Sequence, residues 1–586
     1  MRLTRPEYSD GISTVTQAAF GGIDRRLSAS DGAIIDSVNM TCEHYPVLST
    51  RRMRSSFGQF FVIGEHYSLG GGENALLCVC DVADTPFYII GREDAAGGVG
   101  ALLVCVVDGQ DVCERTLFEY SLSDGGAAWC GLRPTAVAYN RALVISVGGR
   151  LFRCTYDADA AELSCEEIGG SVDGCFRVTN RAGEYTRLEM DAHPSRDSRL
   201  TENFYEGMTI LLRGEREDEE SGDSIPYEIP VRVLSSDIDI GYDRDYKWIL
   251  DIEYTDLIET DYEKGEAELS LRAKVPELSS ICVCRDRVWG YYGNEIYASA
   301  SCDARNWYSY EGTSADSFYA QIPEVSEFTA ITSFGGYVYL FTREGAYCIY
   351  GTTPDAFTLH PVHIAGVCES ERSSFGIITG GMCYNSIEGP VLFDGSGVRS
   401  IAATIPDLQL RSAIAVGHLS RYYVAQGSDV YVYDSQIGAW HRLSYDADVI
   451  AMLVLGGRVV SFDGDEALYI EADEDEQEWW PDSEMSSMVE FADISEGGLY
   501  GVMPCGFSLL AYLGEEARLT LSISYDGGEW QQIYTTAREG KHVHRVRFSP
   551  RERCSCYRLR LDGRGEWRLY SLSRSYAPCA SVPYGE

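Results

Sequence analysis

Two segments of the sequence resemble a motif that is known from enzymes. In each of them an aspartate stands four positions before a tryptophan. Each resembles an Asp-box, Ser-x-Asp-x-Gly-x-x-Trp, but is one residue short before its tryptophan, and the first also lacks the glycine. In such a turn the carboxylate accepts backbone N–H groups and the indole packs beneath the hairpin, which stabilises the fold. We therefore expect structural roles, with buried indoles, for Asp303, Trp307, Asp526 and Trp530.

Motifs of known enzyme classes do not accompany these turns. Asp-boxes occur in sialidase propellers, but a sialidase also needs arginines around a carboxylate and a tyrosine nucleophile. Nothing in the sequence assigns such a cluster. The sequence also has no Walker loop, no Gly-x-Gly-x-x-Gly after a strand and no Gly-x-Ser-x-Gly elbow. We therefore expect no enzyme activity, no catalytic residue and no bound cofactor.

Two patterns could bind a metal ion. His542 and His544 would share one face of a strand, but zinc needs at least one more protein ligand. The segment from Ser236 to Asp245 carries four carboxylates, which calcium favours, without the spacing of an EF-hand loop. No Cys-x-x-Cys pair occurs among the 19 cysteines. We expect the two histidines to lie on a solvent-exposed strand face and the acidic segment to be a solvated strand edge, both without metal. A zinc site at the histidines and a calcium site at the acidic segment are the alternatives.

From about residue 61 the sequence changes to short apolar strands separated by glycine turns. One sequence pattern recurs: an apolar strand, a tight glycine turn and a second strand rich in tyrosine or phenylalanine. Each copy predicts a β-hairpin. A hairpin that recurs at about blade length predicts a β-propeller, whose blades close into a ring to bury their faces; a pair of β-sandwiches is the rival fold. The clearest copies are 141–154, 287–299, 337–350, 422–434 and 458–470.

Changes in composition divide this all-β chain into a β-propeller with an inserted β domain, an extended N-terminal arm and a C-terminal β-sandwich. The N-terminal sequence is irregular and contains many glycines, which predicts an arm that lies on another surface. Charged strands in the middle predict the insertion, and strict alternation after the acidic run 471–476 predicts sheets with one wet face. The predicted divisions are arm 1–60, first blades 61–171, inserted domain 172–278, remaining blades 279–480 and sandwich 481–586.

The charge balance limits the partners of the chain. It has 48 basic and 90 acidic side chains and a net charge of −42. This argues against wrapping nucleic acid, which needs clustered Lys and Arg, and against docking on anionic lipid. The opening residues lack an apolar signal region, and no apolar run approaches the roughly 18 residues that span a bilayer. We expect folding in a reducing cytoplasm, no membrane insertion, and cysteine used as a small strand residue.

Short motifs open the chain: Phe20-Gly21-Gly22, then Asn39-Met40, then Pro46 to Arg51. Further motifs follow in the centre, at 287–290, 296–299, 330–334, 340–345 and 366–381. In this order they resemble the tail nozzle-like virion proteins of short-tailed bacteriophages, which begin with a Gly-Gly arm, an Asn-Met or Asn-Val step and a Leu-x-x-Arg step. The resemblance covers most of the chain. It suggests as residues of an assembly arm Phe20, Gly21, Gly22, Asn39, Pro46 and Arg51.

The resemblance implies a structural protein of the phage tail, assembled in the bacterial cytoplasm and located in the virion. It further implies a homo-oligomeric, hexameric ring that contacts other tail or adaptor proteins and forms part of the DNA ejection channel. DNA would pass without specific binding, because an acidic lining repels phosphate. The C-terminal sandwich departs from the simplest nozzle pattern, so a nozzle, a neck component and a tail-side adhesin all stay open.

The alternative function is a tail-associated β-propeller adhesin that binds or degrades carbohydrate at the host surface. Aromatic rings can stack on sugars, and two aromatic segments offer such platforms. Packing between blades or at a domain junction is the simpler interpretation of both. The segments are Glu478-Trp479-Trp480-Pro481 and Trp307-Tyr308-Ser309-Tyr310.

Overall fold

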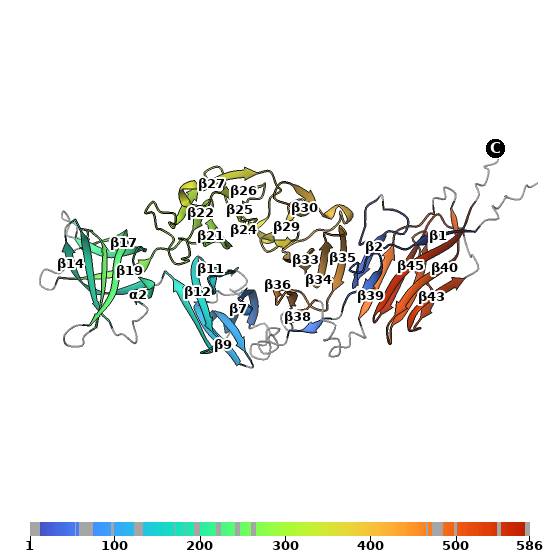
Figure 1. Ribbon diagram of the computed structural model, residues 1–586, viewed down its shortest axis with the longest axis horizontal. Helices are drawn as coiled ribbons and strands as arrows, with labels where there is room; N and C mark the ends of the chain where they lie inside the picture. Colours follow the sequence, from blue (N-terminus) through green and yellow to red (C-terminus); the bar gives the residue numbers. More distant parts are fainter. Residues whose placement is uncertain are drawn as a thin grey trace, which may run out of the picture. The chain divides into compact units, whose positions relative to one another are not determined.

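The structure is a computed structural model, and it consists almost entirely of antiparallel β-strands (Figure 1). Among the described residues, no helix is long and apolar enough to cross a membrane. The chain forms two compact units, Val62–Glu369 on the one hand and Met1–Phe61 with Ser370–Glu586 on the other. The described residues are all except 1–11, 28, 53, 58–73, 95–98, 110, 122–132, 170, 182, 193–199, 218–223, 241–245, 259–264, 464–466, 471–484, 497–500, 548–552 and 580–586.

The repeated hairpins form seven separate four-stranded antiparallel sheets, so the all-β class and the repeat are confirmed. Each copy of the recurring sequence pattern is the second and third strand of one sheet. In these meanders the central strands are covered on both faces, which explains why they appear in the sequence as continuous apolar runs. The strand β11 (Ala142–Val147) is buried at every position. Its turn into the next strand uses Gly148 and Gly149 with φ of +58° and +74°, which a tight hairpin requires.

The unit Val62–Glu369 contains four of these sheets and a barrel. The first two sheets are β6 (Asn74–Val82), β7 (Thr85–Asp94), β8 (Val99–Asp108) and β9 (Asp111–Ser121), then β10 (Thr135–Tyr139), β11, β12 (Arg150–Asp157) and β13 (Glu162–Ile168). The next two are β20 (Ser280–Cys284), β21 (Arg287–Tyr292), β22 (Glu295–Ala298) and β23 (Phe318–Gln321), then β24 (Ala330–Phe334), β25 (Tyr337–Phe341), β26 (Ala346–Tyr350) and β27 (Thr358–Val362).

The barrel is closed by six strands in the order β14-β15-β18-β17-β16-β19, drawn in green in Figure 1. Apolar side chains alternate into its interior, where Phe176 and Phe204 contact the fully buried Trp248. The sequence divided off this region as 172–278, close to the limits of the barrel. Its elements are β14 (Ser171–Arg181), β15 (Tyr185–Asp191), α2 (Leu200–Asn203), β16 (Thr209–Glu217), β17 (Ser224–Ile240), β18 (Tyr246–Glu253) and β19 (Glu266–Ala273).

The other unit contains the remaining three four-stranded sheets. They comprise β28 (Gly376–Ile378), β29 (Gly381–Ser386), β30 (Gly389–Phe393) and β31 (Val398–Ser400), then β32 (Ile414–His418), β33 (Arg421–Gln426), β34 (Asp429–Asp434) and β35 (Ala439–Ser444). The last sheet is β36 (Ala451–Leu455), β37 (Arg458–Phe462), β38 (Ala467–Tyr469) and β5 (Ser55–Ser56). Its fourth strand therefore comes from the N-terminal segment.

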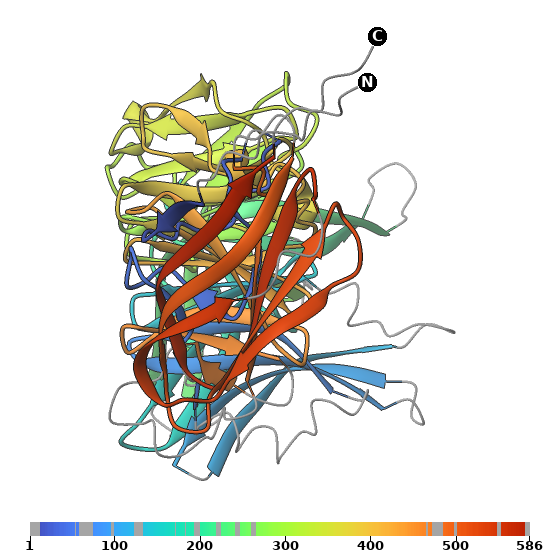
Figure 2. The same ribbon diagram turned by 90° about the vertical axis from the view of Figure 1, so that its right-hand side faces the viewer.

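The same unit ends in a domain of two sheets that enclose one hydrophobic core (Figure 2, red and orange strands). One sheet has the order β2-β39-β44-β41-β42, and the other has β3-β4-β45-β40-β43 with β1 beside β45. The strands are β1 (Ser13–Gln17), β2 (Ile34–Val38), β3 (Met40–Thr41), β4 (Leu48–Thr50), β39 (Ser486–Phe491), β40 (Val502–Leu513), β41 (Arg518–Tyr525), β42 (Gln531–Thr536), β43 (Gly540–Arg547), β44 (Tyr557–Arg564) and β45 (Trp567–Pro578).

The prediction of an N-terminal arm on another surface is therefore wrong for the described residues. Strand β1 pairs with β45, β2 pairs with β39, and β4 pairs with β45. Phe20 and Met40 are fully buried in the core of the two-sheet domain. Local sequence could not reveal this, because β1, β2 and β4 pair with strands at the far end of the chain. The two-sheet domain accordingly begins with the N-terminal segment and not at residue 481.

Candidate functional site

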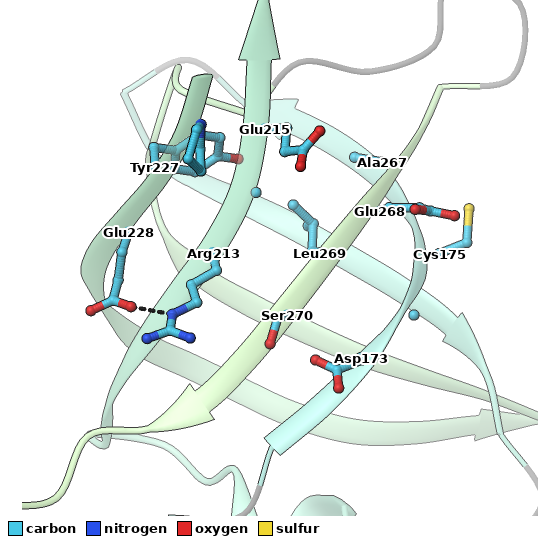
Figure 3. Close-up of a pocket in the computed structure, with 13 residues that line it drawn as sticks. Asp173, Cys175, Arg213, Glu215, Tyr227, Glu228, Ala267, Glu268, Leu269 and Ser270 are labelled. Atoms are coloured by element: carbon cyan, nitrogen blue, oxygen red, sulfur yellow. Dashed lines mark hydrogen bonds and ion pairs between the residues drawn. The ribbon is translucent and has the colours of Figure 1, made fainter. Parts of the chain in front are cut away.

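A cleft opens in the barrel where β16 and β19 separate. Their hydrogen-bonded ladder extends over four positions and ends at Arg213 and Ser270. Strand β16 nevertheless runs on to Glu217, and β19 already begins at Glu266. Figure 3 shows the two strands diverging beyond Arg213 and Ser270. A cavity of about 900 Å³ lies at this divergence.

Polar side chains cross the outer face of the barrel in one row at the end of this ladder. Glu228 on β17 lies opposite Arg213, which lies opposite Ser270, which in turn lies opposite Asp173 on β14. Arg213 forms an ion pair with Glu228, drawn as a dashed line in Figure 3. Because these two side chains are 54% and 40% exposed, water screens the pair and it adds little to stability.

The rim of the cleft is acidic and its base is apolar and aromatic. Glu215 on β16 and Glu268 on β19 lie at the rim, with Leu269 and Tyr227 among the lining side chains. Gly214 permits this arrangement, because a Cβ atom there would lie 2.4 Å from the hydroxyl oxygen of Tyr227. A side chain at this position would therefore displace the tyrosine ring.

The cleft can bind a ligand that donates hydrogen bonds or carries positive charge. Four carboxylates and one guanidinium line it, so acceptor oxygens outnumber donors: Asp173, Glu215, Glu228, Glu268 and Arg213. No group of three or more metal-ligating side chains in the described part of the chain is placed to hold a metal ion. Sequence reasoning missed these residues. Alternation shows which side chains point outward, but not where two strands part.

The first Asp-box-like turn lies beside a second cavity, of about 410 Å³. The Asp303 carboxylate accepts the backbone N–H of Arg305 at 3.0 Å. Trp307 has no exposed surface, and its indole N–H donates to the Ala304 carbonyl at 2.8 Å. In this turn the carboxylate caps the backbone and the indole is buried, which is the arrangement that the motif predicts.

Charged groups around this cavity join the barrel to the neighbouring sheets. The hydroxyl of Tyr205, which follows α2, donates to the Asp303 carboxylate. Burial and the charge of Asp303 raise the pKa of the Tyr205 phenol, so it remains a donor at neutral pH. Arg305 and Arg153 both form ion pairs with Glu166. These polar groups pair with one another, and the arrangement holds loops together.

The second Asp-box-like turn differs from the prediction. Asp526 does not cap its own turn: its carboxylate accepts the N–H groups of Ser555 at 2.7 Å and Cys556 at 3.0 Å, just before β44. Trp530 is 37% exposed, so the predicted burial of its indole is wrong. The shortened turn ends in an irregular stretch before β42, and the tryptophan is not carried under the hairpin. The guanidinium carbon of Arg560 lies over the indole ring of Trp530, 6.0 Å from its centroid.

The predicted assembly residues lie together inside one unit. The Ile23 N–H donates to the Trp440 carbonyl at 2.7 Å, and a Cβ atom on Gly22 would lie 2.1 Å from that oxygen. Gly22 is therefore required by close contact with β35. The Phe20 N–H donates to the carbonyl of Pro46 at 3.1 Å, which joins two parts of the segment. Gly21 has open space where a Cβ atom would be placed.

Asn39 joins a propeller-type sheet to the two-sheet domain. Its side-chain amide donates to the Ser486 carbonyl at 2.8 Å, and its oxygen accepts the Ser444 N–H at 3.1 Å. The Arg51 guanidinium also donates to this oxygen, at 3.3 Å. Asn39 has φ of +56°, a conformation that asparagine adopts more readily than most residues. The motif residues therefore form a junction within the chain, and no free arm is formed by the described residues.

The remaining sequence candidates fall partly within and partly outside the described residues. His542 and His544 share one face of β43, where His544 is buried against Tyr534 and His542 contacts the Glu539 carbonyl. Burial and the neighbouring His542 lower the pKa of His544. In the Trp307 segment, Tyr310 is 58% exposed. Residues 241–245 of the acidic segment, the run 471–476 and the Trp479-Trp480 platform lie outside the described residues.

Comparison with known proteins does not assign the chain to a family. No family model matches, and no curated protein matches. Among solved structures, BamB from Moraxella catarrhalis covers 73% of this chain and 98% of its own, at 10% identity and a TM-score of 0.32. The WD40 domain of SCAP from fission yeast covers 67% and 94%, at 10% identity and 0.28. An exo-β-1,3-galactanase from Phanerochaete chrysosporium covers 85% and 94%, at 9% identity and 0.19. At such low identities and TM-scores, these similarities assign no property to the chain.

Proposed function

We propose that the chain is a structural protein of a bacteriophage tail, a nozzle-like component whose seven four-stranded sheets close into a propeller and whose copies form a ring around the DNA path. The observation that carries this proposal is the use of the N-terminal segment. Its strands complete the last four-stranded sheet and both sheets of the two-sheet domain. The described N-terminal strands and β45 are thereby joined in one unit, an arrangement suited to a part that transmits force.

The use of buried charge supports a structural role. The Arg287 guanidinium, 2% exposed, donates to the carbonyls of Ser299 and Ser314, each at 2.7 Å. The Glu371 carboxylate, 6% exposed, accepts the side-chain amide of Asn385 at 2.9 Å. These groups stabilise loops between strands, where an unpaired buried charge would be costly.

A second buried network joins β1 to β45. Arg574 on β45 forms an ion pair with Glu496 at 2.8 Å, and the two side chains are 2% and 3% exposed. The Tyr557 hydroxyl donates to the same carboxylate at 2.9 Å. Arg574 also donates to the side-chain oxygen of Gln17 on β1, at 3.3 Å. The N-terminal strand is therefore fastened to β45 by side chains as well as by the backbone.

Net charge supports the proposed channel. At −42 per chain, a ring would repel the phosphate backbone and let DNA slide without specific contacts. The N-terminal and central motifs that resemble tail nozzle-like proteins give the same expectation. This proposal includes the finer architecture, in which the barrel is an insertion between blades and the two-sheet domain is a C-terminal sandwich.

Immunogold labelling tests the proposal. An antibody against the purified chain should mark one end of the tail when it is applied to particles of the phage that encodes the chain. Particles stripped of tails by shear should lose the label, whereas an antibody against the capsid should still bind them. Unlabelled intact tails, together with the chain recovered only from the particle-free fraction, would contradict the proposal.

The barrel cleft favours a second candidate function, the binding of a carbohydrate by a tail adhesin. Its carboxylates can accept hydrogen bonds from sugar hydroxyls, and Tyr227 contributes an aromatic ring to the lining. A glycan array probed with the whole chain should then show binding that Glu268→Ala weakens. The matched control is Glu253→Ala, on the exposed surface of β18. Binding that is absent, or that both variants weaken equally, would exclude the cleft as a glycan site.

A further inference from the structure

Two cysteines face each other across neighbouring strands of the second sheet. Cys154 on β12 lies directly opposite Cys165 on β13. Among the ladders of the described residues, no other position pairs a cysteine with a cysteine. Both thiols are free in the structure. Their register brings two reactive groups of the same kind together.

The two cysteines pack into one hydrophobic cluster. Both side chains belong to the core that includes Phe152 and Leu163 from the same strands. Directly opposite residues of an antiparallel pair have Cβ atoms about 4.5–5.5 Å apart, and a disulfide needs about 3.5–4.5 Å. A small approach of the two strands therefore suffices.

The position of β13 allows this approach. Among the described strands it is the edge strand of its sheet and pairs through its backbone with β12 alone. The chain reverses between Asp157 and Glu162, so the cysteines lie close to a hairpin turn that can adjust. An edge strand beside a turn can shift with fewer lost contacts than a central strand such as β11.

The two thiols differ in access. Cys154 has no exposed surface, whereas Cys165 is only partly buried. The neighbouring Cys165 thiol and burial raise the pKa of the Cys154 thiol far above its usual range. Cys165 is therefore the entry point for a reagent from solution, and Cys154 is the group that reacts second.

We propose that Cys154 and Cys165 form a reversible cross-strand disulfide when the protein meets a low-molecular-weight disulfide such as oxidised glutathione. The Cys165 thiolate attacks one sulfur of glutathione disulfide, which forms a mixed disulfide and releases one glutathione thiolate that takes up a proton. The Cys154 thiolate, after losing its proton to solvent, attacks the Cys165 sulfur and expels the second glutathione. The protein loses two electrons and two protons, and glutathione disulfide is reduced to two glutathione molecules.

The disulfide would lock the outer edge of the sheet. It joins the edge strand to β12, so β13 can no longer separate while β12 stays in place. The cross-link closes a short loop and removes open conformations, which should shift the local opening equilibrium by roughly a hundredfold. This proposal rests on strand register and shared packing and holds whether or not the chain belongs to a phage tail.

The experiment uses the full chain, reduced and then incubated with glutathione disulfide. After alkylation and non-reducing digestion, mass spectrometry should find the 154–165 cross-link as the main disulfide, and dithiothreitol should remove it. Hydrogen exchange of the β13 amides should be at least about tenfold slower in the oxidised form. Both effects should be absent in Cys165→Ser and in Cys154→Ala, and should persist in the matched buried control Cys282→Ala from another sheet.

Two results would overturn the proposal. One is a wild-type protein that keeps both thiols alkylatable after prolonged oxidation. The other is a set of disulfides in which Cys165 pairs with several cysteines at similar yield. If Cys154→Ala does not fold, the exposed-side variant Cys165→Ser still decides the outcome, because it removes the partly buried thiol.

Discussion

The turns at Asp303 and Asp526 have the same spacing between aspartate and tryptophan and differ in what they do. At the first, the carboxylate caps its own turn and Trp307 is completely buried. At the second, the carboxylate reaches across to the N–H groups before β44, and Trp530 is 37% exposed. Spacing therefore determines that an aspartate stands near a tryptophan, whereas the surroundings determine whether the pair forms a folded unit.

The surroundings explain the difference. Trp307 enters a cluster that contains Val144 of β11 and Val288 of β21, two strands from different sheets, and is therefore enclosed. Trp530 precedes β42, an edge strand of a single sheet, so it has protein on fewer sides. A tryptophan between two sheets is buried by both, and one at an edge is not.

Replacing the buried indole should give the largest effect. Trp307→Ala removes a side chain with no exposed surface, together with its hydrogen bond to Ala304. We expect a loss of about 3–5 kcal/mol in the free energy of unfolding of the surrounding sheets. Urea unfolding followed by hydrogen exchange of the β21 and β22 amides would measure it. A loss below about 1 kcal/mol would show that burial does not distinguish the two turns.

Removing the first carboxylate should cost less. Asp303→Ala leaves the N–H of Arg305 and the hydroxyl of Tyr205 without their acceptor. We expect a loss of about 1–2 kcal/mol. The control Tyr205→Phe should reproduce part of it, because it removes only the second of these bonds. Equal stability of Asp303→Ala and wild type in thermal unfolding would show that the turn needs no cap.

The exposed tryptophan should matter little. Trp530→Ala removes a side chain that is 37% exposed, so less apolar area is lost from the fold than at Trp307. We expect at most about 1 kcal/mol, measured in the same urea series. A loss as large as that of Trp307→Ala would reverse the comparison.

The smallest effect is expected at the second aspartate. Asp526 is exposed, and solvent can replace its bonds to the N–H groups of Ser555 and Cys556. Asp526→Ala should therefore change stability by no more than about 0.5 kcal/mol. The thermal midpoint of the two-sheet domain would reveal a larger change. If that occurred, the bridge to β44 would be a main support of the domain.

The sequence by itself determined the all-β class and the repeated hairpins, because period-2 alternation, continuous apolar strands and glycine turns are local properties. The change in charge predicted a separate β domain at 172–278, and the strands of the barrel lie between Ser171 and Ala273. The burial of Trp307 followed from the same local rules.

Only the tertiary structure decided where the N-terminal strands pair and where a cleft opens. The strands β1, β2 and β4 are too short to indicate their partners, and their pairing with β39 and β45 depends on apolar neighbours from the far end of the sequence. The divergence of β16 from β19 and the meeting of Cys154 with Cys165 are matters of register. Register is set when whole sheets pack, because a shift by one residue would turn every buried side chain outward.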